Sequence, residues 1–253
     1  MGTPALSVVI PAYNESARIG ATLRALASVT ADRDVEVIVV DDGSTDDTAV
    51  LAEELLGPSN RSRVLRQERN RGKGAAVRAG VMDARGDAIL YMDADLATDL
   101  EALPRFLDEL RVADVVVGSR SVVGAVVEQG TWDRALMGRA FNALARASTR
   151  VPIHDTQCGF KAFRSTAARN LFTLARSDKF AFDVEILVLA QRLGYQVLER
   201  PVRWTAVDGS SVRRVTDSTR AAIDVLRIAL RWTPRRVRRA AVAAGISRGP
   251  GDA

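Results

Sequence analysis

The first half of the chain alternates short apolar runs with longer stretches of helical periodicity, and this alternation constrains the fold more than any other feature. Apolar residues recur at the spacing of amphipathic helices over residues 15–28, 46–56, 73–84 and 100–111. The runs expected to form strands are residues 6–10, 35–40, 63–67, 88–92 and 114–118. Because strands separated by helices are typical of βαβ units, we predict a Rossmann-like α/β fold with a mostly parallel sheet flanked by helices.

The second half follows a different pattern. Helical spacing predicts helices over residues 132–149, 184–193 and 216–230, while residues 196–205 carry one or two strands. Neither an internal repeat nor a clear linker is present, so a single domain over residues 1–232 is predicted, with its halves meeting near residue 120. Residues 233–253 are basic and then rich in Gly, Pro and Ser, and are expected to form a partly disordered tail.

Three polar loops follow predicted strands, at residues 11–15, 41–46 and 93–95. Parallel strands end at the same edge of a sheet, and α/β sheets bind ligands beyond the carboxyl ends of their strands. The three loops are therefore expected to meet at one ligand site.

The loop Asp93-Ala94-Asp95 places two carboxylates close together. Residues two apart at a strand end point their side chains the same way, so these carboxylates repel each other unless a cation lies beside them. Mg²⁺ and Mn²⁺ take oxygen ligands and often combine one or two carboxylates with substrate phosphates. Asp93 and Asp95 are therefore predicted to bind a divalent metal, with a solvated acidic turn as the alternative.

The other two loops offer groups suited to a nucleoside. Asp41 and Asp42 can accept hydrogen bonds from a ribose or a base, and Gly43 lets the backbone approach a ligand. Ser44 can belong to this site, cap the next helix, or do both. The run Pro11-Ala12-Tyr13-Asn14-Glu15 either forms a wall for a flat base, with its tyrosine ring, or makes a plain turn from strand to helix.

Gly72-Lys73-Gly74 opens a predicted helix, where backbone N–H groups and the Lys73 charge can face a phosphate. The segment is not a P-loop, and Val77 occupies the place of the third glycine of a dinucleotide fingerprint. A net charge of +5 agrees with a partner that carries phosphates. Cys158 is the single cysteine, so it forms no internal disulfide, and it is expected to be a small buried residue rather than a nucleophile.

These motifs resemble those of family 2 glycosyltransferases with the GT-A fold. The resemblance is carried by Val8-Val9-Ile10-Pro11-Ala12-Tyr13-Asn14-Glu15, Val39-Val40-Asp41-Asp42-Gly43-Ser44-Thr45-Asp46, Gly72-Lys73-Gly74 and Met92-Asp93-Ala94-Asp95. Residues 117–120, 155–163 and 180–185 of the second half are similar to the dolichyl-phosphate β-glucosyltransferase group, which has the polyprenyl-phosphate mannose synthases as close relatives. The run Asp155-Thr156-Gln157-Cys158-Gly159-Phe160-Lys161 is the most specific for that group.

The resemblance implies an inverting transfer of glucose from UDP-glucose to a polyprenyl or dolichyl phosphate, with Mg²⁺ or Mn²⁺ as cofactor. By this analogy, Asp41 and its neighbours hold the nucleoside. Asp93, Ala94 and Asp95 hold the diphosphate and the metal, which neutralises the leaving group. Lys73 and Arg120 share that role. The resemblance offers Asp155 either as a general base or as a residue that positions the acceptor or Lys161.

The resemblance also places a set of acceptor residues, namely Arg120, Arg134, Arg139, Gln157, Ser210 and Arg213. For Arg134 and Arg139, a solvated helix face is the alternative. The group usually ends its acceptor loop with Gly-Ser-Lys, whereas residues 208–211 read Asp-Gly-Ser-Ser and lack the lysine.

The first residues lack the pattern of a signal peptide, and no run of about 18 apolar residues is present, so we expect a cytoplasmic protein. Trp232 and the arginines at 235, 236, 238 and 239 suggest peripheral contact with the anionic cytoplasmic face of a membrane. The alternatives are a GDP-mannose-dependent mannose synthase, a transferase for a soluble acceptor, and a basic nucleic-acid-binding protein. The last is disfavoured because aromatic residues total only 5% and are not interleaved with the arginines.

Overall fold

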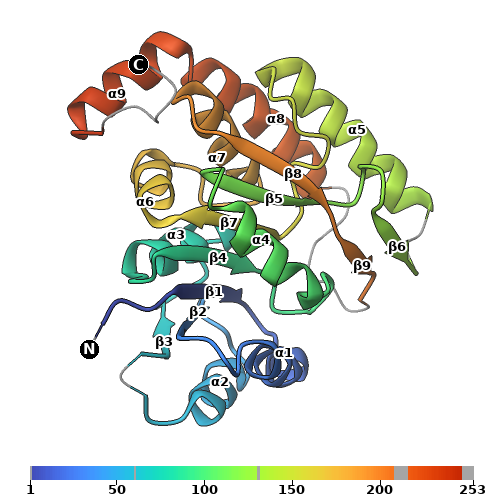
Figure 1. Cartoon of the computed structure of the whole chain (residues 1–253). Helices are drawn as coiled ribbons and strands as arrows, with labels where there is room; N and C mark the ends of the chain where they lie inside the picture. Colours follow the sequence, from blue (N-terminus) through green and yellow to red (C-terminus); the bar gives the residue numbers. More distant parts are fainter. Residues whose placement is uncertain (1, 60, 130–131, 208–215, 247–253) are drawn as a thin grey trace.

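A seven-stranded sheet forms the centre of the molecule, which is a computed structural model that describes residues 2–59, 61–129, 132–207 and 216–246 (Figure 1). Its strands are β1 (Leu6–Ala12), β2 (Val35–Asp41), β3 (Arg63–Arg66), β4 (Ala88–Met92), β5 (Val115–Ser119), β7 (Phe160–Arg164) and β8 (Val197–Pro201). Their order is β3-β2-β1-β4-β7-β5-β8, and β7 runs antiparallel to both neighbours while the other pairs are parallel. The predicted mostly parallel α/β sheet is confirmed, within a single domain.

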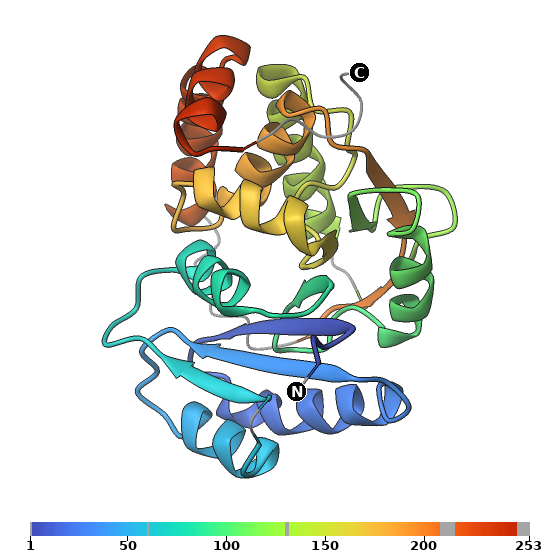
Figure 2. The same cartoon turned by 60° about the vertical axis from the view of Figure 1, so that its left-hand side comes forward.

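Both faces of this sheet are covered, which explains why its central strands read as continuous apolar runs. All seven residues of β1 are buried. The helices α1 (Ser16–Val29) and α2 (Thr48–Leu56) lie on one side, together with η1 (Leu100–Ala102) and α4 (Leu103–Glu109). The helix α3 (Lys73–Asp83) packs on the opposite side, as Figure 2 shows.

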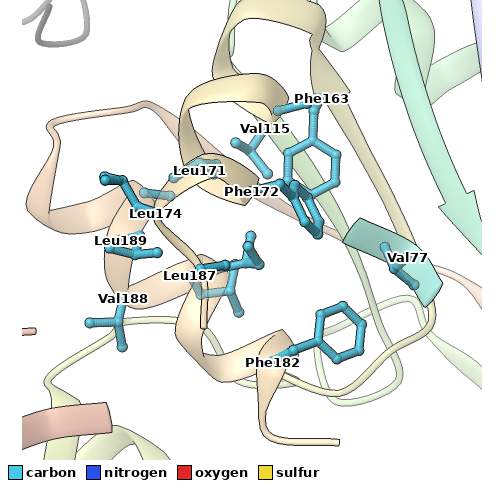
Figure 3. Packing of buried hydrophobic residues seen from close by; sticks show 14 of the residues in the cluster. Val77, Val115, Phe163, Leu171, Phe172, Leu174, Phe182, Leu187, Val188 and Leu189 are labelled. Atoms are coloured by element: carbon cyan, nitrogen blue, oxygen red, sulfur yellow. The ribbon is translucent and has the colours of Figure 1, made fainter. Parts of the chain in front are cut away.

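The second half adds helices to the α3 side of the sheet. These are α5 (Trp132–Thr149), α6 (Ser165–Leu174), α7 (Phe182–Arg192), α8 (Thr216–Arg231) and α9 (Pro234–Ala243). Residues 182–190 of α7 are all buried, so α7 is a core helix that is enclosed on every side. Phe163, Phe172 and Phe182 fill the space between α6, α7 and the sheet (Figure 3), where truncation of one such ring to alanine typically costs about 3–5 kcal/mol.

Besides α9, three elements were not expected from the sequence. The strand β6 (Val126–Glu128) pairs with β9 (Arg203–Thr205) in a small parallel sheet. The strand β7 lies between β4 and β5, so a segment of the second half completes the sheet of the first. The helix α6 follows β7 directly.

The prediction of a basic tail from residue 233 is wrong for residues 234–243. These residues form α9, in which Val237 and Ala241 are buried in the same core as α7. Trp232, expected at a membrane surface, is also buried, and its indole N–H donates to the Glu185 carboxylate at 2.5 Å. Within the part of the chain that the structure describes, no helix is at once long and apolar enough to cross a membrane.

Candidate active site

A pocket of about 370 Å³ opens at the carboxyl ends of β1 and β4. The strand order reverses between these two neighbours, which is the place where α/β sheets bind ligands. Eight of the residues singled out from the sequence line this pocket, namely Pro11, Tyr13, Glu15, Asp42, Lys73, Asp93, Ala94 and Asp95. The structure therefore brings together parts of all three predicted loops and the start of α3.

The two carboxylates after β4 both reach the pocket. The Asp93 carboxylate pairs with the Lys73 ammonium at 2.5 Å. Asp95 accepts a hydrogen bond from the Ala97 amide at 3.0 Å, and burial together with the charge of Asp93 raises the pKa of the Asp95 carboxyl above its ordinary value. A cation beside the two carboxylates would offset both the burial of Asp95 and its repulsion from Asp93.

Lys73 is the positive counterpart of this acidic pair. Burial alone would lower the pKa of its ammonium, but the negative charges of Asp93 and Asp183 outweigh burial and raise the pKa above its ordinary range. The side chain therefore stays protonated at neutral pH. Because it stands at the first position of α3, the helix N-terminus adds to its attraction for a phosphate.

A divalent metal is compatible with these residues. Across residues 2–59, 61–129, 132–207 and 216–246, no group of three or more His, Cys, Asp or Glu side chains forms a complete metal cage. Two carboxylates with room for substrate oxygens match the usual binding of Mg²⁺, which keeps waters or takes phosphate ligands. Asp93 and Asp95 would hold such an ion, and it would supply a Lewis acid beside the diphosphate.

Gly159 makes room for the Asp93 carboxylate. A Cβ atom built at this glycine would lie 2.0 Å from one carboxylate oxygen of Asp93 and 2.3 Å from its carboxyl carbon. The backbone C=O of Gly159 also accepts a hydrogen bond from the Asp93 amide at 3.1 Å. The sequence motif contained this glycine, but its contact with Asp93 depends on β7 lying beside β4, which was not predicted.

The loop after β2 contributes less directly than expected. Asp42 lines the pocket and accepts hydrogen bonds from the amides of Arg71 and Gly72, both at 2.8 Å. Asp41 and Ser44 do not line the pocket, and the Asp41 carboxylate accepts a long contact from the Ser44 amide. Gly43 has φ +72°, and a Cβ there would lie 2.6 Å from the backbone of Arg69, so only glycine suits this turn.

The loop after β1 is held by the loop after β2. Asn14 adopts φ 54°, its amide donates to Ser44 Oγ at 2.9 Å, and its side-chain oxygen accepts from the Thr45 amide at 2.9 Å. These contacts fix the turn so that Tyr13 and Glu15 face the pocket while Asn14 points away from it. Burial raises the pKa of Glu15, against the opposing effect of its ion pair with Arg18.

Arg120 and Asp155 form a second polar unit outside the walls of this pocket. The Arg120 guanidinium donates to both Asp155 oxygens, at 2.7 and 2.9 Å, and stacks 5.3 Å from the Trp204 ring centre. Burial alone would raise the pKa of Asp155, but the hydrogen bonds and charge of Arg120 hold the pKa below its usual range. Of the two roles left open for Asp155, this geometry favours positioning over proton transfer, with Arg120 as the group positioned and not Lys161.

The expected acceptor residues are only partly described. Gln157 is half-buried beside Asp155, and Arg139 is exposed on α5. Arg134 also belongs to α5, but its side chain lies outside the described part of the chain, as do Ser210 and Arg213 entirely. The predicted departure at residues 208–211 falls in the same undescribed segment.

Several pocket residues were missed from the sequence. Arg18, Asn70, Lys179, Phe180 and Val207 complete its walls. Lys179 and Phe180 immediately precede α7, and Phe180 belongs to a segment that was noticed but given no role. Cys158 is buried as expected, and burial raises the pKa of its thiol to about 11, so it is a poor nucleophile.

Comparison with known proteins agrees with this geometry. The model of glycosyl transferase family 2 matches residues 7–172. A dolichyl-phosphate β-glucosyltransferase of Dictyostelium discoideum is 36% identical over 243 residues, which cover 90% of this chain and 74% of that protein. The Homo sapiens protein of the same description is 36% identical over 247 residues, covering 91% and 76%. Glycosyltransferase AglD of Haloferax volcanii is 35% identical over 249 residues, covering 95% of this chain and 40% of AglD.

Among solved structures, the fold resembles glucosyl-3-phosphoglycerate synthase from Mycobacterium tuberculosis. Its complex with Mn²⁺, UDP and glucosyl-3-phosphoglycerate superimposes with a TM-score of 0.69 at 22% identity, covering 89% of this chain and 80% of that one. Its complex with Mg²⁺ and UDP gives the same TM-score, the same identity and the same coverage of this chain, and the match covers 79% of that chain.

Proposed function

Because the chain belongs to glycosyl transferase family 2, we propose that it transfers glucose from UDP-glucose to a dolichyl or other polyprenyl phosphate, with inversion at the sugar. The observation that carries this proposal is the convergence of Asp93, Asp95 and Lys73 in one pocket where the strand order reverses. The names of the relatives that are 34–39% identical support the sugar and the acceptor.

The pocket offers separate places for the parts of the donor. Asp93 and Asp95 would hold a divalent cation and, through it, the diphosphate, while the Lys73 ammonium contacts the phosphates directly. The Tyr13 ring and the carboxylate of Asp42 lie on the wall suited to the nucleoside. Asp41, Gly43 and Ser44 act from behind this wall by fixing the two loops.

The proposed reaction needs no separate base. An oxygen of the acceptor phosphate forms a bond to the anomeric carbon as the bond from that carbon to the β-phosphate oxygen breaks, and UDP leaves with the electron pair. Phosphates with a second pKa near about 6 are mostly ionised at neutral pH, so the attacking oxygen carries no proton to remove. Asp155 is therefore not required as a base, which agrees with the observation that both of its carboxylate oxygens accept hydrogen bonds from Arg120.

Arg120 is well placed to bind the acceptor phosphate. Its side chain is 30% exposed, and it is oriented by Asp155 on one side and by the Trp204 ring on the other. A planar guanidinium held in this way can bind a phosphate through two parallel hydrogen bonds. Gln157, whose amide donates to Asp155, and Arg139, which is exposed on α5, remain further candidates for contact with the acceptor.

We also propose that α8 and α9 rest on the cytoplasmic face of a membrane, where a polyprenyl acceptor would be found. Three apolar side chains of α8 are exposed at helical spacing, namely Ile223, Leu226 and Leu230. The exposed arginines of α9 at positions 235, 236, 238 and 239 would face anionic headgroups. Membrane contact therefore rests on these side chains and not on the buried Trp232.

A nucleotide-release assay tests the reaction. UDP-glucose and GDP-mannose are each supplied with a short-chain polyprenyl phosphate or with glycerol phosphate, in the presence of Mn²⁺ or EDTA. We expect UDP release only from UDP-glucose with the polyprenyl phosphate and metal. Release of GDP, or equal turnover with the soluble phosphate, would contradict the proposed donor or acceptor.

Vesicle flotation tests the membrane surface. The substitution Leu230→Glu should reduce binding to anionic vesicles, because it places a charge in the apolar stripe of α8. Val112→Glu is the matched control, since Val112 is 67% exposed and Leu230 is 72% exposed, but Val112 lies after α4. Equal binding of the two variants would refute the proposed surface.

A further inference from the structure

Two ion pairs lie next to each other on one face of β4 and β7. Asp93 at the end of β4 pairs with Lys73 of α3. Farther along the same ladder, Lys161 of β7 pairs with Asp183 of α7, with 2.5 Å between Nζ and Oδ1. The first pair belongs to the donor pocket, whereas the second is fully enclosed and is not part of the proposed reaction.

The Lys161 ammonium is completely buried and has a fixed set of partners. Besides Asp183, it donates to the backbone oxygen of Cys158 at 2.7 Å and lies 5.4 Å from the centre of the Tyr91 ring. The Tyr91 hydroxyl donates to the same Asp183 oxygen that accepts from Lys161. Tyr91 and Lys161 are also directly paired in the β4–β7 ladder.

Stability alone does not account for such a pair. Desolvation of two ions costs several kcal/mol each, and apolar replacements of buried ion pairs are often neutral or stabilising. The packing around this small polar cluster is apolar, because the Phe163 ring stacks on Tyr91 and the Phe182 ring lies tilted against it, so the core itself does not require a charged pair here. The pair is therefore better explained by what it holds in place.

Lys161 holds the peptide against which the Asp93 carboxylate rests. Its bond to the Cys158 oxygen orients the Cys158–Gly159 peptide, and the Gly159 backbone in turn accepts from the Asp93 amide and lies against the Asp93 carboxyl group. Asp183 acts on Lys73, the positive member of the pocket pair, because its carboxylate is one of the anions that favour the protonated form of Lys73. The buried pair thus acts on both members of the pocket pair, on Asp93 through the Cys158–Gly159 peptide and on Lys73 through the charge of Asp183.

We propose that Lys161, Asp183 and Tyr91 form a positioning unit for diphosphate and metal, which fixes Gly159 against Asp93 and places a second anion near Lys73. The inference rests on the proposed function, since it assigns these residues to the binding of a nucleoside diphosphate with Mg²⁺ or Mn²⁺. Residues that orient metal ligands in this way typically change metal affinity by about 10–100-fold when replaced.

The test compares a buried carboxylate close to the pocket, that of Asp183, with one far from it, that of Glu36. The double variant Lys161→Met with Asp183→Asn removes both charges together, so that no buried ion is left unpaired. Glu36→Gln is the control, because Glu36 is equally buried and bound to Ser7 and Arg63, but lies at the opposite ends of β1 and β2 from the pocket. The full chain is titrated with UDP in the presence of Mn²⁺ by calorimetry, and its thermal unfolding is recorded.

We expect the double variant to stay folded and to bind UDP with Mn²⁺ at least about tenfold more weakly than the wild type. The donor KM should rise with it, while Tyr91→Phe gives a smaller loss in the same direction. Glu36→Gln should lower the melting temperature and leave UDP affinity unchanged. A double variant with wild-type affinity, or a loss shared equally by Glu36→Gln, would overturn the positioning role; a wild type that binds no UDP with Mn²⁺ would instead overturn the proposed function itself.

Discussion

Replacing Gly159 by alanine tests whether the position of the Asp93 carboxylate matters, because the added methyl group displaces this carboxylate without changing its chemistry. The added Cβ would lie 2.0 Å from one carboxylate oxygen, whereas non-bonded carbon atoms in proteins settle at about 3.5–4.0 Å. The carboxyl group must therefore move by more than about 1 Å. The backbone of Gly159 does not have a positive φ, so the effect comes from the methyl group rather than from backbone strain.

The magnitude follows from two separate costs. Overpacking of a well-filled site typically lowers the free energy of unfolding by about 1–3 kcal/mol. A misplacement of about 1 Å in a catalytic constellation can reduce the rate on the order of 10²-fold. We therefore expect Gly159→Ala to fold, with a lower melting temperature, and to lose affinity for UDP with Mn²⁺ and nearly all turnover.

Calorimetric titration with UDP and Mn²⁺, together with a UDP-release assay, measures both effects. Gly138→Ala is the matched control, because a Cβ at Gly138 meets nothing within 4 Å and alanine favours the helix that contains it. Its donor binding should equal that of the wild type. If Gly159→Ala binds UDP and Mn²⁺ within about twofold of the wild type, Asp93 does not need the position seen here, and the assigned metal site is wrong.

Three further outcomes follow from the structure. Asp95→Asn should abolish UDP release without lowering the melting temperature, because the change removes a proposed metal ligand but also relieves the repulsion from Asp93; a fully active variant would contradict the assignment. The rise in melting temperature caused by Mn²⁺, measured by scanning fluorimetry, should shrink as the pH falls from neutral into the acidic range, because burial and the charge of Asp93 raise the pKa of the Asp95 carboxyl and a protonated carboxyl binds the metal poorly. Without metal, the contribution of Asp95 to stability changes with pH in the opposite direction, because a carboxyl group whose pKa is raised in the folded state stabilises the fold at low pH. A metal effect on the melting temperature that does not depend on pH would count against Asp95 as a ligand. Trp232→Phe removes the indole donor to Glu185 and should lower the free energy of unfolding by about 1–3 kcal/mol in urea titrations, whereas an exposed, membrane-facing Trp232 would give no loss.

The parts of the site that the sequence predicted are those encoded by local pattern. Asp93 and Asp95 follow a β-strand whose apolar run is plain in the sequence, and parallel strands bring their carboxyl ends to one edge of the sheet, where the structure pairs this strand with β1. Lys73 stands at a helix start that Gly72 and Gly74 mark. Each of these predictions needed only a few neighbouring residues and the general geometry of parallel sheets.

The parts that could not be predicted depend on contacts between distant segments. Lys161 lies in a strand in which a charged residue normally indicates an exposed position, and its main charged partner, Asp183, comes 22 residues later in the chain. Glu185 likewise gains its partners from the loop at Arg176 and Ser177 and from Trp232. No pattern within either segment of the sequence predicts these pairings.

The C-terminal helix shows a different kind of error. The arginines that surround Val237 suggested a basic, partly disordered tail that contacts a membrane, although Val237 and Ala241 stand one helical turn apart after Pro234, which is a favourable first residue of a helix. The interpretation of the sequence relied on the charged residues of one helix face and overlooked the two apolar residues of the other face. A short helix of this composition is stable because it docks on α7, not because of its own propensity.

The place of β7 in the sheet limits how such a chain can be cut or recombined. A fragment ending near residue 120 would keep the diphosphate-facing loops, but it would lose the strand that lies between β4 and β5 and expose the backbone edges of both. Exchanging the second half for that of another protein would likewise replace the Gly159 backbone against which Asp93 rests. A chimera would therefore have to take residues 158–164 from the same parent as the Asp93-Ala94-Asp95 loop.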